Sequence, residues 1–289
     1  MIAIRHTPRG PTTLVRTTLV TGGTGTIGAR VAERLWDRGG AVRLGHRGAA
    51  PPFDWADPRS WGPALHGAAG AFVAYQPDLA APEAAWRVGS FAREAVRRGA
   101  RRLVLLSSLR APGARRAEAA LAASGAAWTI LRASAPAQAF TEGPLALRLP
   151  AIARALTGGG AREPFVDAGD VAEVAATALL DGAWLGRALE ITGPRALTPR
   201  EAAAEAAAIL GRGATRSRTK APGAASTSLP AWLAALADGP DLAPTTTLAT
   251  LLGRPARDLR DVAMAAARDR IEPPSTEARA GRRAAQGER

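Results

Sequence analysis

Short apolar runs alternate with longer amphipathic segments along the first half of the chain. Between the runs, apolar residues recur at helical spacing in residues 27–40, 57–68, 83–100 and 114–125. The runs themselves have the length and apolar content of buried strands, and they cover residues 17–23, 41–47, 70–77, 101–108 and 127–134. Strands that alternate with helices predict an α/β fold with a parallel, doubly wound sheet and right-handed crossovers.

Two of these helices have an apolar face that we expect to be buried against the sheet. In the helix predicted over 27–40, the apolar positions are Val31, Leu35 and Trp36. In the helix predicted over 83–100, they are Trp86, Val88, Phe91 and Val96. Glycines follow both patterns and end the helices.

After residue 135 the alternation loosens and helical patterns dominate. One strand is expected at 187–193, and helices are expected at 144–156, 168–182, 198–211, 229–239 and 246–270. Asp170 is the expected N-cap of the second of these helices. Thr198 is the expected N-cap of the third, with Pro199 at its first helical position, and Pro255 is expected to interrupt the last.

These patterns predict a core followed by a smaller part. Residues 17–135 form the core, and residues 136–271 form a smaller, mostly helical C-terminal substrate lobe, interleaved with the core, that closes over the carboxyl edge of the sheet. Residues 1–16 are expected to be a flexible extension, 212–230 a mobile loop and 272–289 a disordered tail, because they carry few large apolar residues.

Composition narrows the class of protein. The 289 residues include no cysteine, which excludes disulfides and thiolate chemistry. The three histidines lie far apart without metal-ligand spacing, so no metal site is expected. No apolar run has the length of a signal peptide or a membrane span. We therefore expect a cytoplasmic protein that does not insert into membranes.

The formal net charge of +13 raises the question of nucleic-acid binding. Lys220 is the single lysine among 38 basic residues, and the arginines are dispersed along an Ala- and Gly-rich chain. This distribution indicates a compositional bias. No nucleic-acid-binding motif is present and aromatic residues are few, so we expect no nucleic-acid partner.

The sequence VTGGTGTIGAR at 20–30 is a glycine-rich loop between a predicted strand and a predicted helix. Gly22, Gly25 and Gly28 have the spacing of a dinucleotide-binding loop, and Gly23 offers a second overlapping register. Glycine there permits a tight turn, lets backbone N–H groups approach a pyrophosphate and packs the helix against the strand. The loop thus predicts a Rossmann-type dinucleotide site, the alternative being an ordinary tight turn.

The end of the second strand indicates which dinucleotide is bound. NAD-binding units place an acidic residue about 20 residues beyond the glycines, on the ribose 2′-hydroxyl. Here no acidic residue lies between Asp37 and Asp54, and the expected position holds Arg43, His46 and Arg47. Arg47, at the end of the strand, is the best candidate for binding a 2′-phosphate, which favours NADPH; the alternative is a solvated loop arginine.

Several segments together resemble a known family. They are TLVTGGTGTIGARVAERL, VLLSS, AEAALAASGAAWTILRAS, PFVDAGDVAEVAATAL, EITGPRALTPREAAAEAA and LLGRPARDLRDVA, spread over about residues 17–270. In this the chain resembles the atypical short-chain dehydrogenase/reductases of the NmrA-like, NAD(P)H-binding branch. That branch includes quinone and azo-dye reductases that use NADPH, phenylpropanoid reductases, and redox-sensing regulators.

The resemblance implies a set of site residues. Around the glycines, Thr24, Thr26 and Ile27 would contact the cofactor, and Asp54 would lie at the adenine. Tyr75, Gln76 and Pro77 would lie along the cofactor, and Ser107 and Ser108 would approach the nicotinamide.

The family's usual Tyr-x-x-x-Lys pair is missing. Tyr75 is the single tyrosine, and it lies far along the chain from Lys220. Aligned with the family, Arg110 stands at the tyrosine position, Ala114 at the lysine position, and Ser134 replaces a proline. Glu118 matches a family glutamate, whose alternative role is that of a helix-surface acid. Proton transfer by a tyrosine held by a lysine is therefore not expected.

Hydride transfer itself requires only that the cofactor lie against an electron-poor acceptor. We therefore expect an NADPH-dependent reductase of a quinone-like or polycyclic aromatic substrate, acting in a biosynthetic pathway. Ser108 would protonate the product, Arg110 would stabilise the developing oxyanion, and Trp128 and Phe140 would line the substrate pocket. A non-catalytic NADP(H) sensor that binds a protein partner, and a reductase or isomerase of another small molecule, are the alternatives. A homodimer and an oxygen-using partner enzyme also stay open.

Overall fold

The computed structural model describes residues 17–76, 78–147, 149, 160–211, 233, 236 and 239–271. The expected extension at 1–16, the loop at 212–230 and the tail at 272–289 lie outside the described residues. Six parallel strands form one sheet in the order β2-β1-β3-β4-β5-β6. The strands are β1 (Thr17–Thr21), β2 (Ala41–Gly45), β3 (Ala68–Val73), β4 (Arg102–Ser108), β5 (Ala127–Ala133) and β6 (Arg187–Ile191). The predicted parallel, doubly wound sheet is confirmed.

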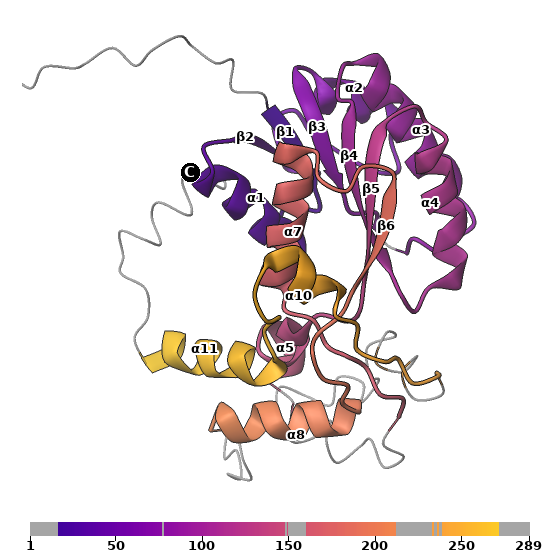
Figure 1. Cartoon of the computed structure of the whole chain (residues 1–289). Helices are drawn as coiled ribbons and strands as arrows, with labels where there is room; N and C mark the ends of the chain where they lie inside the picture. Colours follow the sequence, from indigo (N-terminus) through magenta and orange to yellow (C-terminus); the bar gives the residue numbers. More distant parts are fainter. Residues whose placement is uncertain are drawn as a thin grey trace, which may run out of the picture.

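Helices cover both faces of the sheet (Figure 1). One face carries α1 (Thr26–Asp37), α7 (Ala168–Asp181) and the short α10 (Thr247–Leu252); the other carries α2 (Trp61–Leu65), α3 (Ala84–Arg97) and α4 (Arg115–Ala122). Single 3-10 turns precede α2 and α4, at Pro58–Ser60 and Pro112–Ala114. Each face has its own buried apolar cluster, so alternate residues of each strand serve different layers.

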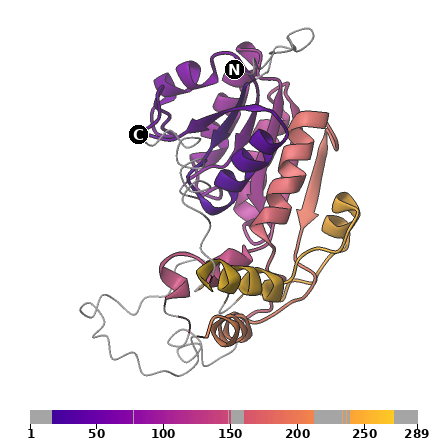
Figure 2. The same cartoon turned by 90° about the vertical axis from the view of Figure 1, so that its left-hand side faces the viewer.

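A third apolar cluster lies beyond the ends of the strands, in the C-terminal part of the chain. It is built on the 3-10 turn Ala137–Phe140, α5 (Gly143–Ala146), α8 (Pro199–Ile209) and α11 (Leu259–Ile271). Figure 2 shows β6 pointing toward this layer, so the lobe lies at the carboxyl edge of the sheet. The division of the chain into domains stays a prediction, since α7 and β6 of the second half complete the first half's layers.

Two helix predictions are corrected in detail. Asp167, not Asp170, caps α7, since its carboxylate accepts from the Gly169 N–H at 3.0 Å and Asp170 lies within the first turn. In α3, Val88 and Phe91 are buried as expected, whereas Trp86 is 59% exposed and Val96 only half-buried. Small alanines take the remaining buried positions, and spacing alone did not reveal them.

Other predicted elements have the expected caps and breaks. Thr198 and Glu201 form a reciprocal capping box at the start of α8, with Pro199 in its first turn. Pro255 separates α10 from α11. Of the helix expected at 144–156, the described residues show α5 and the helical Leu149, and the helix expected at 229–239 lies almost wholly outside them. No helix in the described ranges is both long and apolar enough to cross a membrane.

Candidate functional site

The topology creates a crevice at the carboxyl ends of β1 and β3. The chain leaves β1 toward α1 on one face and leaves β3 toward α3 on the other, so the loops after neighbouring strands diverge. Such a switch point is where doubly wound sheets bind ligands. The loops after β1, β2, β3 and β4 carry most of the residues singled out in the sequence, and they all emerge at this edge.

The glycine loop is shaped by two close approaches. Gly22 has a left-handed φ of +66°, and its carbonyl accepts from the Gly25 N–H at 2.9 Å. A Cβ on Gly28 would overlap the Gly22 carbonyl, whose carbon would lie 2.7 Å away. The first turn of α1 is therefore pressed against the end of β1 at a distance that only glycine permits.

Gly23 is more constrained than the sequence suggested. A Cβ on Gly23 would lie 2.8 Å from Leu44 Cδ2, a side chain of β2, whereas one on Gly25 would meet only the Gly22 oxygen at 3.3 Å. Both overlapping glycine spacings therefore have a structural role. Gly23 packs the loop against β2, and Gly28 packs α1 against β1.

The N-terminus of α1 presents backbone donors. Gly25 is the N-cap and no side chain caps the helix. Within the described residues, the N–H groups of Thr24, Thr26 and Ile27 have no hydrogen-bond acceptor, and Thr24 and Thr26 are exposed. Unpaired donors at a helix N-terminus favour an anion, through both hydrogen bonds and the helix dipole.

The two arginines of the second strand differ in their surroundings. Arg43 donates to the carbonyls of Ala64 and His66, both at 2.7 Å, so its guanidinium is used in holding the end of α2. Arg47 lies just beyond β2, is exposed, and has no partner in the described part of the chain. It is therefore the arginine that is available to a ligand at the carboxyl edge.

Asp54 lies in the loop after β2 and stabilises that loop. Its Oδ1 accepts from the Ala56 N–H at 2.8 Å, and its carbonyl accepts from Trp61 Nε1 at 2.8 Å. Its side chain is half-buried. A contact between Asp54 and an adenine ring stays a prediction.

Tyr75 is held in the core rather than at the surface. Its ring is 6% exposed and packs edge-on against Trp55 at 5.1 Å, within an aromatic cluster that also includes Phe53, Trp61 and Phe91. The tyrosine can therefore face a ligand with its backbone but not with its ring. Gln76 is exposed, and Pro77 lies outside the described residues.

Ser107 and Glu118 form a buried polar network at the end of β4. The Ser107 hydroxyl donates to Glu118 Oε1 at 2.6 Å, and both Arg132 and Arg115 donate to the same carboxylate, each at 2.7 Å. Burial raises the pKa of Glu118, but the hydrogen bonds from Arg132, Ser107 and Arg115 outweigh burial and leave that pKa below its ordinary value. Glu118 is thus an ionised acceptor, not the helix-surface acid of the alternative.

The guanidinium of Arg110 is bound to residues of the lobe. Its Nε donates to Glu163, a carboxylate that is fully buried, and its two terminal nitrogens donate to the carbonyls of Pro240 at 2.9 Å and Arg162 at 3.0 Å. The expected role of Arg110 in stabilising a substrate oxyanion is corrected, because its guanidinium clamps the loop after β4 to two segments of the lobe.

The hydroxyl of Ser108 has a different environment from that of Ser107. Its oxygen accepts from the Arg110 N–H at 3.2 Å, and the side chain is half-buried. Its hydrogen has no acceptor in the described structure. Ser108 can therefore donate, so its expected role toward a substrate stays a prediction.

The two aromatic residues expected in the substrate pocket lie elsewhere. Trp128 pairs with Leu103 at the start of β5, at the end of the sheet opposite the crevice. Phe140 is fully buried against Phe165, with ring centroids 4.9 Å apart, inside the third apolar cluster. Phe140 is a core residue, and Trp128 packs half-buried against the apolar cluster on the α3 face, because place in the fold and not aromatic character decided their environment.

Sequence reasoning missed three buried acids that organise the lobe. Glu163 binds Arg110 and accepts from the Ala135 N–H at 2.8 Å. Asp167 pairs with Arg257 at 3.1 Å, and Asp170 pairs with Arg254 at 2.7 Å. The pair of aspartates in the sequence DAGD, followed by arginines in GRPAR, was the available signal, whereas nothing local marks Glu163.

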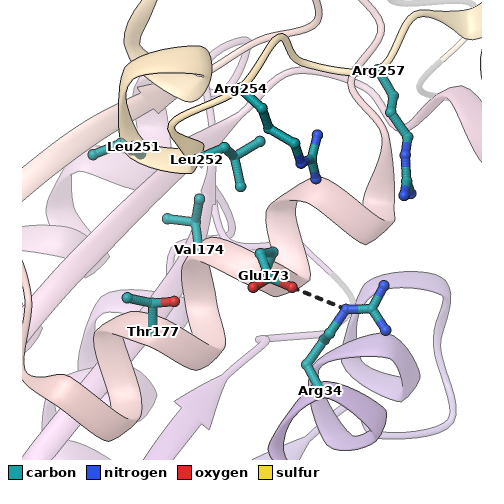
Figure 3. Close-up of a pocket in the computed structure, with 8 residues that line it drawn as sticks. All are labelled: Arg34, Glu173, Val174, Thr177, Leu251, Leu252, Arg254 and Arg257. Carbon is teal, nitrogen blue, oxygen red and sulfur yellow. Dashed lines mark ion pairs between the residues drawn. The ribbon is translucent and has the colours of Figure 1, made fainter. Parts of the chain in front are cut away.

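Two cavities of about 380 Å³ lie beside α1 rather than over the crevice. The one in Figure 3 lies between α1, α7 and α10, and its three arginines pair with carboxylates, as Arg34 does with Glu173 at 3.1 Å. The second lies between α1, the turn Ala137–Phe140 and α11, with Arg30 bonded to Glu142 at 2.5 Å on its wall. Both cavities lie between packed helices.

Replacing Gly28 with alanine should destabilise the protein. The added Cβ overlaps the Gly22 carbonyl, so α1 must move away from β1, at a cost of about 1–3 kcal/mol. Urea unfolding measures this loss. Gly48→Ala is the matched control, because the nearest atoms to its Cβ are 3.5 Å away in the His46 ring. Equal stability of the two variants would contradict the close packing.

Replacing Arg110 with alanine should cost about 3–5 kcal/mol of unfolding free energy, because Glu163 would be left buried without its partner. Arg162→Ala is the control, since its ion pair with Glu201 is nearly half exposed and worth less than about 1 kcal/mol. Denaturant titrations measure the loss of unfolding free energy in both variants. Similar losses would contradict the stabilising role of the buried Arg110–Glu163 pair.

Comparison with known proteins agrees with this architecture. No family model matches the chain. It is 32% identical to a (4-alkanoyl-5-oxo-2,5-dihydrofuran-3-yl)methyl phosphate reductase of Streptomyces griseus, over 84% of this chain and 95% of the relative. It is 34% identical to the uncharacterized oxidoreductase YesF of Bacillus subtilis, over 67% of this chain and 71% of the relative.

Solved structures share the fold at lower identity. The triphenylmethane reductase of Citrobacter sp., complexed with NADP(H), superposes with a TM-score of 0.62 at 17% identity, covering 87% of this chain and 99% of that one. The NADPH-dependent quinone oxidoreductase of Escherichia coli, complexed with NADPH, gives 0.63 at 20% identity over 86% and 98%. The two relatives above show the family, and the two solved structures share its fold. The chain belongs to the NmrA-like branch of the atypical short-chain dehydrogenase/reductases, a family of NAD(P)H-dependent oxidoreductases.

Proposed function

We propose that this protein is an NADPH-dependent reductase of a flat, electron-poor conjugated substrate, quinone-like or polycyclic aromatic. The observation that carries the proposal is the glycine crevice with an unpaired arginine beside it. Backbone donors face the crevice at Thr26 and Ile27, and Arg47 is exposed at the end of the neighbouring strand. The relatives' and neighbours' names, which include reductases and NADP(H) complexes, support the same conclusion.

The residues present fit a dinucleotide with a 2′-phosphate. The close approach at Gly28 and the open first turn of α1 suit a pyrophosphate, and Arg47 suits the additional phosphate. The two acids in the described loop between β2 and α2, Asp54 and Asp57, are both engaged within that loop, Asp54 with the Ala56 N–H and Asp57 with Arg59, so neither is free for a 2′-hydroxyl. When bound, NADPH supplies the hydride.

The chain's own contribution to chemistry is positioning and one hydroxyl. Tyr75 is buried among aromatic rings, and Arg110 is bound to the lobe, so neither reaches a substrate. Ser108 retains a hydrogen for donation and can pass a proton, in exchange with water, to the oxygen of a reduced substrate. Such weak acid assistance suits acceptors whose reduced oxygen is a stable phenolate or enolate.

The proposed substrate class follows from the weak acid assistance that Ser108 can give. A quinone takes up hydride readily and leaves a phenolate, which needs little help from an acid. The neighbouring structures include a quinone oxidoreductase and a triphenylmethane reductase. The name of the first describes a quinone as acceptor, in agreement with the proposed class.

The Streptomyces griseus relative favours a second candidate of related chemistry. Its name describes a dihydrofuran whose ring double bond adjoins an oxo group and an alkanoyl group, and the match covers 95% of that protein. Hydride addition to such a bond leaves an enolate, which again needs only a weak acid. A conjugated lactone is therefore the alternative substrate class.

Removal of the Arg47 charge should weaken NADPH selectively. Arg47→Ala is expected to raise the dissociation constant for NADPH about tenfold, the effect of one charge-assisted hydrogen bond, and to leave that for NADH unchanged. Arg59→Ala is the control, since Arg59 is 91% exposed and pairs only with its neighbour Asp57. Calorimetric titration decides, and equal losses for both cofactors would refute the assignment.

A panel of acceptors tests turnover. We expect NADPH oxidation, followed by absorbance, with a naphthoquinone and with a conjugated lactone, and none with cyclohexanone, whose alkoxide product requires a stronger acid. The relative rates decide between the two substrate classes. Tight NADPH binding without oxidation by any acceptor would overturn the reductase proposal in favour of a non-catalytic NADP(H) sensor.

A further inference from the structure

In the hydrogen-bond network of Ser107, every bond is donated to the same carboxylate, and the site residues described so far do not explain why. Three groups donate to the Glu118 carboxylate: Arg132, Arg115 and the Ser107 hydroxyl. Glu118 is 3% exposed and Ser107 is 5% exposed, so water does not compete for these bonds. An ionised carboxylate accepts only, which means that Ser107 must donate its single hydrogen to Glu118.

This arrangement leaves Ser107 as an acceptor and nothing else. Its hydrogen is used, while the lone pairs of Oγ have no donor in the described structure. Ser108 has the opposite pattern, since its oxygen accepts from Arg110 and its hydrogen stays available. A ligand group that faces Ser107 must therefore carry an N–H or O–H.

The strand order indicates which ligand group that is. Arg47 follows β2, the glycine loop follows β1, and Ser107 is the last residue but one of β4, in a sheet whose order begins β2-β1-β3-β4. A dinucleotide with its 2′-phosphate at Arg47 and its pyrophosphate at α1 continues in the same direction across β3. Three strand spacings, about 14 Å, separate β2 from β4, which is within the reach of an extended dinucleotide.

We propose that Ser107 accepts a hydrogen bond from the carboxamide N–H of the nicotinamide ring, and that Glu118 and Arg132 are positioning residues that keep its hydroxyl in this orientation. The inference rests on the proposed binding of NADP(H). It assigns the buried Ser107–Glu118–Arg132 network to recognition of the cofactor's reactive end. It also explains why the acid in this network is ionised and held by arginines rather than poised to transfer a proton.

Binding of two oxidised cofactors tests the inference without turnover. The probes are NADP⁺ and 3-acetylpyridine adenine dinucleotide phosphate, in which an acetyl group replaces the carboxamide and removes its N–H. The unmodified protein should bind NADP⁺ about fivefold more tightly by calorimetry, the effect of one neutral hydrogen bond. Ser107→Ala should bind both equally, because it loses affinity for NADP⁺ alone.

Glu118→Gln tests the positioning residue. The amide oxygen would face Arg132, which leaves the amide N–H2 pointing to Ser107, so the Ser107 hydrogen is freed to donate. The preference for NADP⁺ should disappear in this variant. A purely structural role for Glu118 would weaken both cofactors by the same factor, and that result would overturn the positioning role.

Ser124→Ala is the matched control, since Ser124 is a buried serine after α4 whose oxygen only accepts from the Ala126 N–H at 3.3 Å. It should keep the fivefold preference. Equal binding of the two probes by the unmodified protein, or a preserved preference in Ser107→Ala, would overturn the inference and leave NADP(H) binding intact. Failure of the unmodified protein to bind NADP⁺ at all would overturn the proposed function with it. If Glu118→Gln does not fold, the Ser107→Ala comparison decides alone.

Discussion

Four carboxylates are buried in the part of the chain that the structure describes, and each of them depends on an arginine. Glu118 binds Arg132, Glu163 binds Arg110, Asp167 binds Arg257 and Asp170 binds Arg254. A buried charge without a partner costs several kcal/mol, so these pairs fix which segments must meet. Arginine suits this role because it keeps its charge and offers several donors in one plane. Part of the excess of arginine in the composition is therefore required by the structure.

Three of the four pairs also determine how the lobe lies on the sheet. Glu118 and Arg132 are within the core, while the other three join the sheet and α7 to the segments around 162 and 254–257. Arg257 contributes its backbone N–H to Asp170 as well as its side chain to Asp167. The chain before α11 is therefore held from two directions, and the lobe is placed over the crevice by charge as much as by its own apolar cluster.

The sequence was sufficient for the sheet and for the glycine loop, because both have strong local signals. Strand length, helical spacing and the glycine pattern each depend on a few neighbouring residues. The same reasoning was insufficient for Trp128 and Phe140, since aromatic character does not say whether a residue lies at the amino or carboxyl end of a strand. Arg110 was assigned to the substrate for a similar reason: its partner Glu163 is 53 residues away, and no local pattern links the two.

Besides its ion pair with Glu163, the clamp formed by Arg110 contacts the lobe through two backbone carbonyls, those of Arg162 and Pro240. Such contacts do not depend on which side chains stand at those two positions. The joint therefore tolerates substitutions at positions 162 and 240 as long as Glu163 keeps its buried carboxylate. The position of this part of the chain on the sheet is thus independent of the side chains at those two positions.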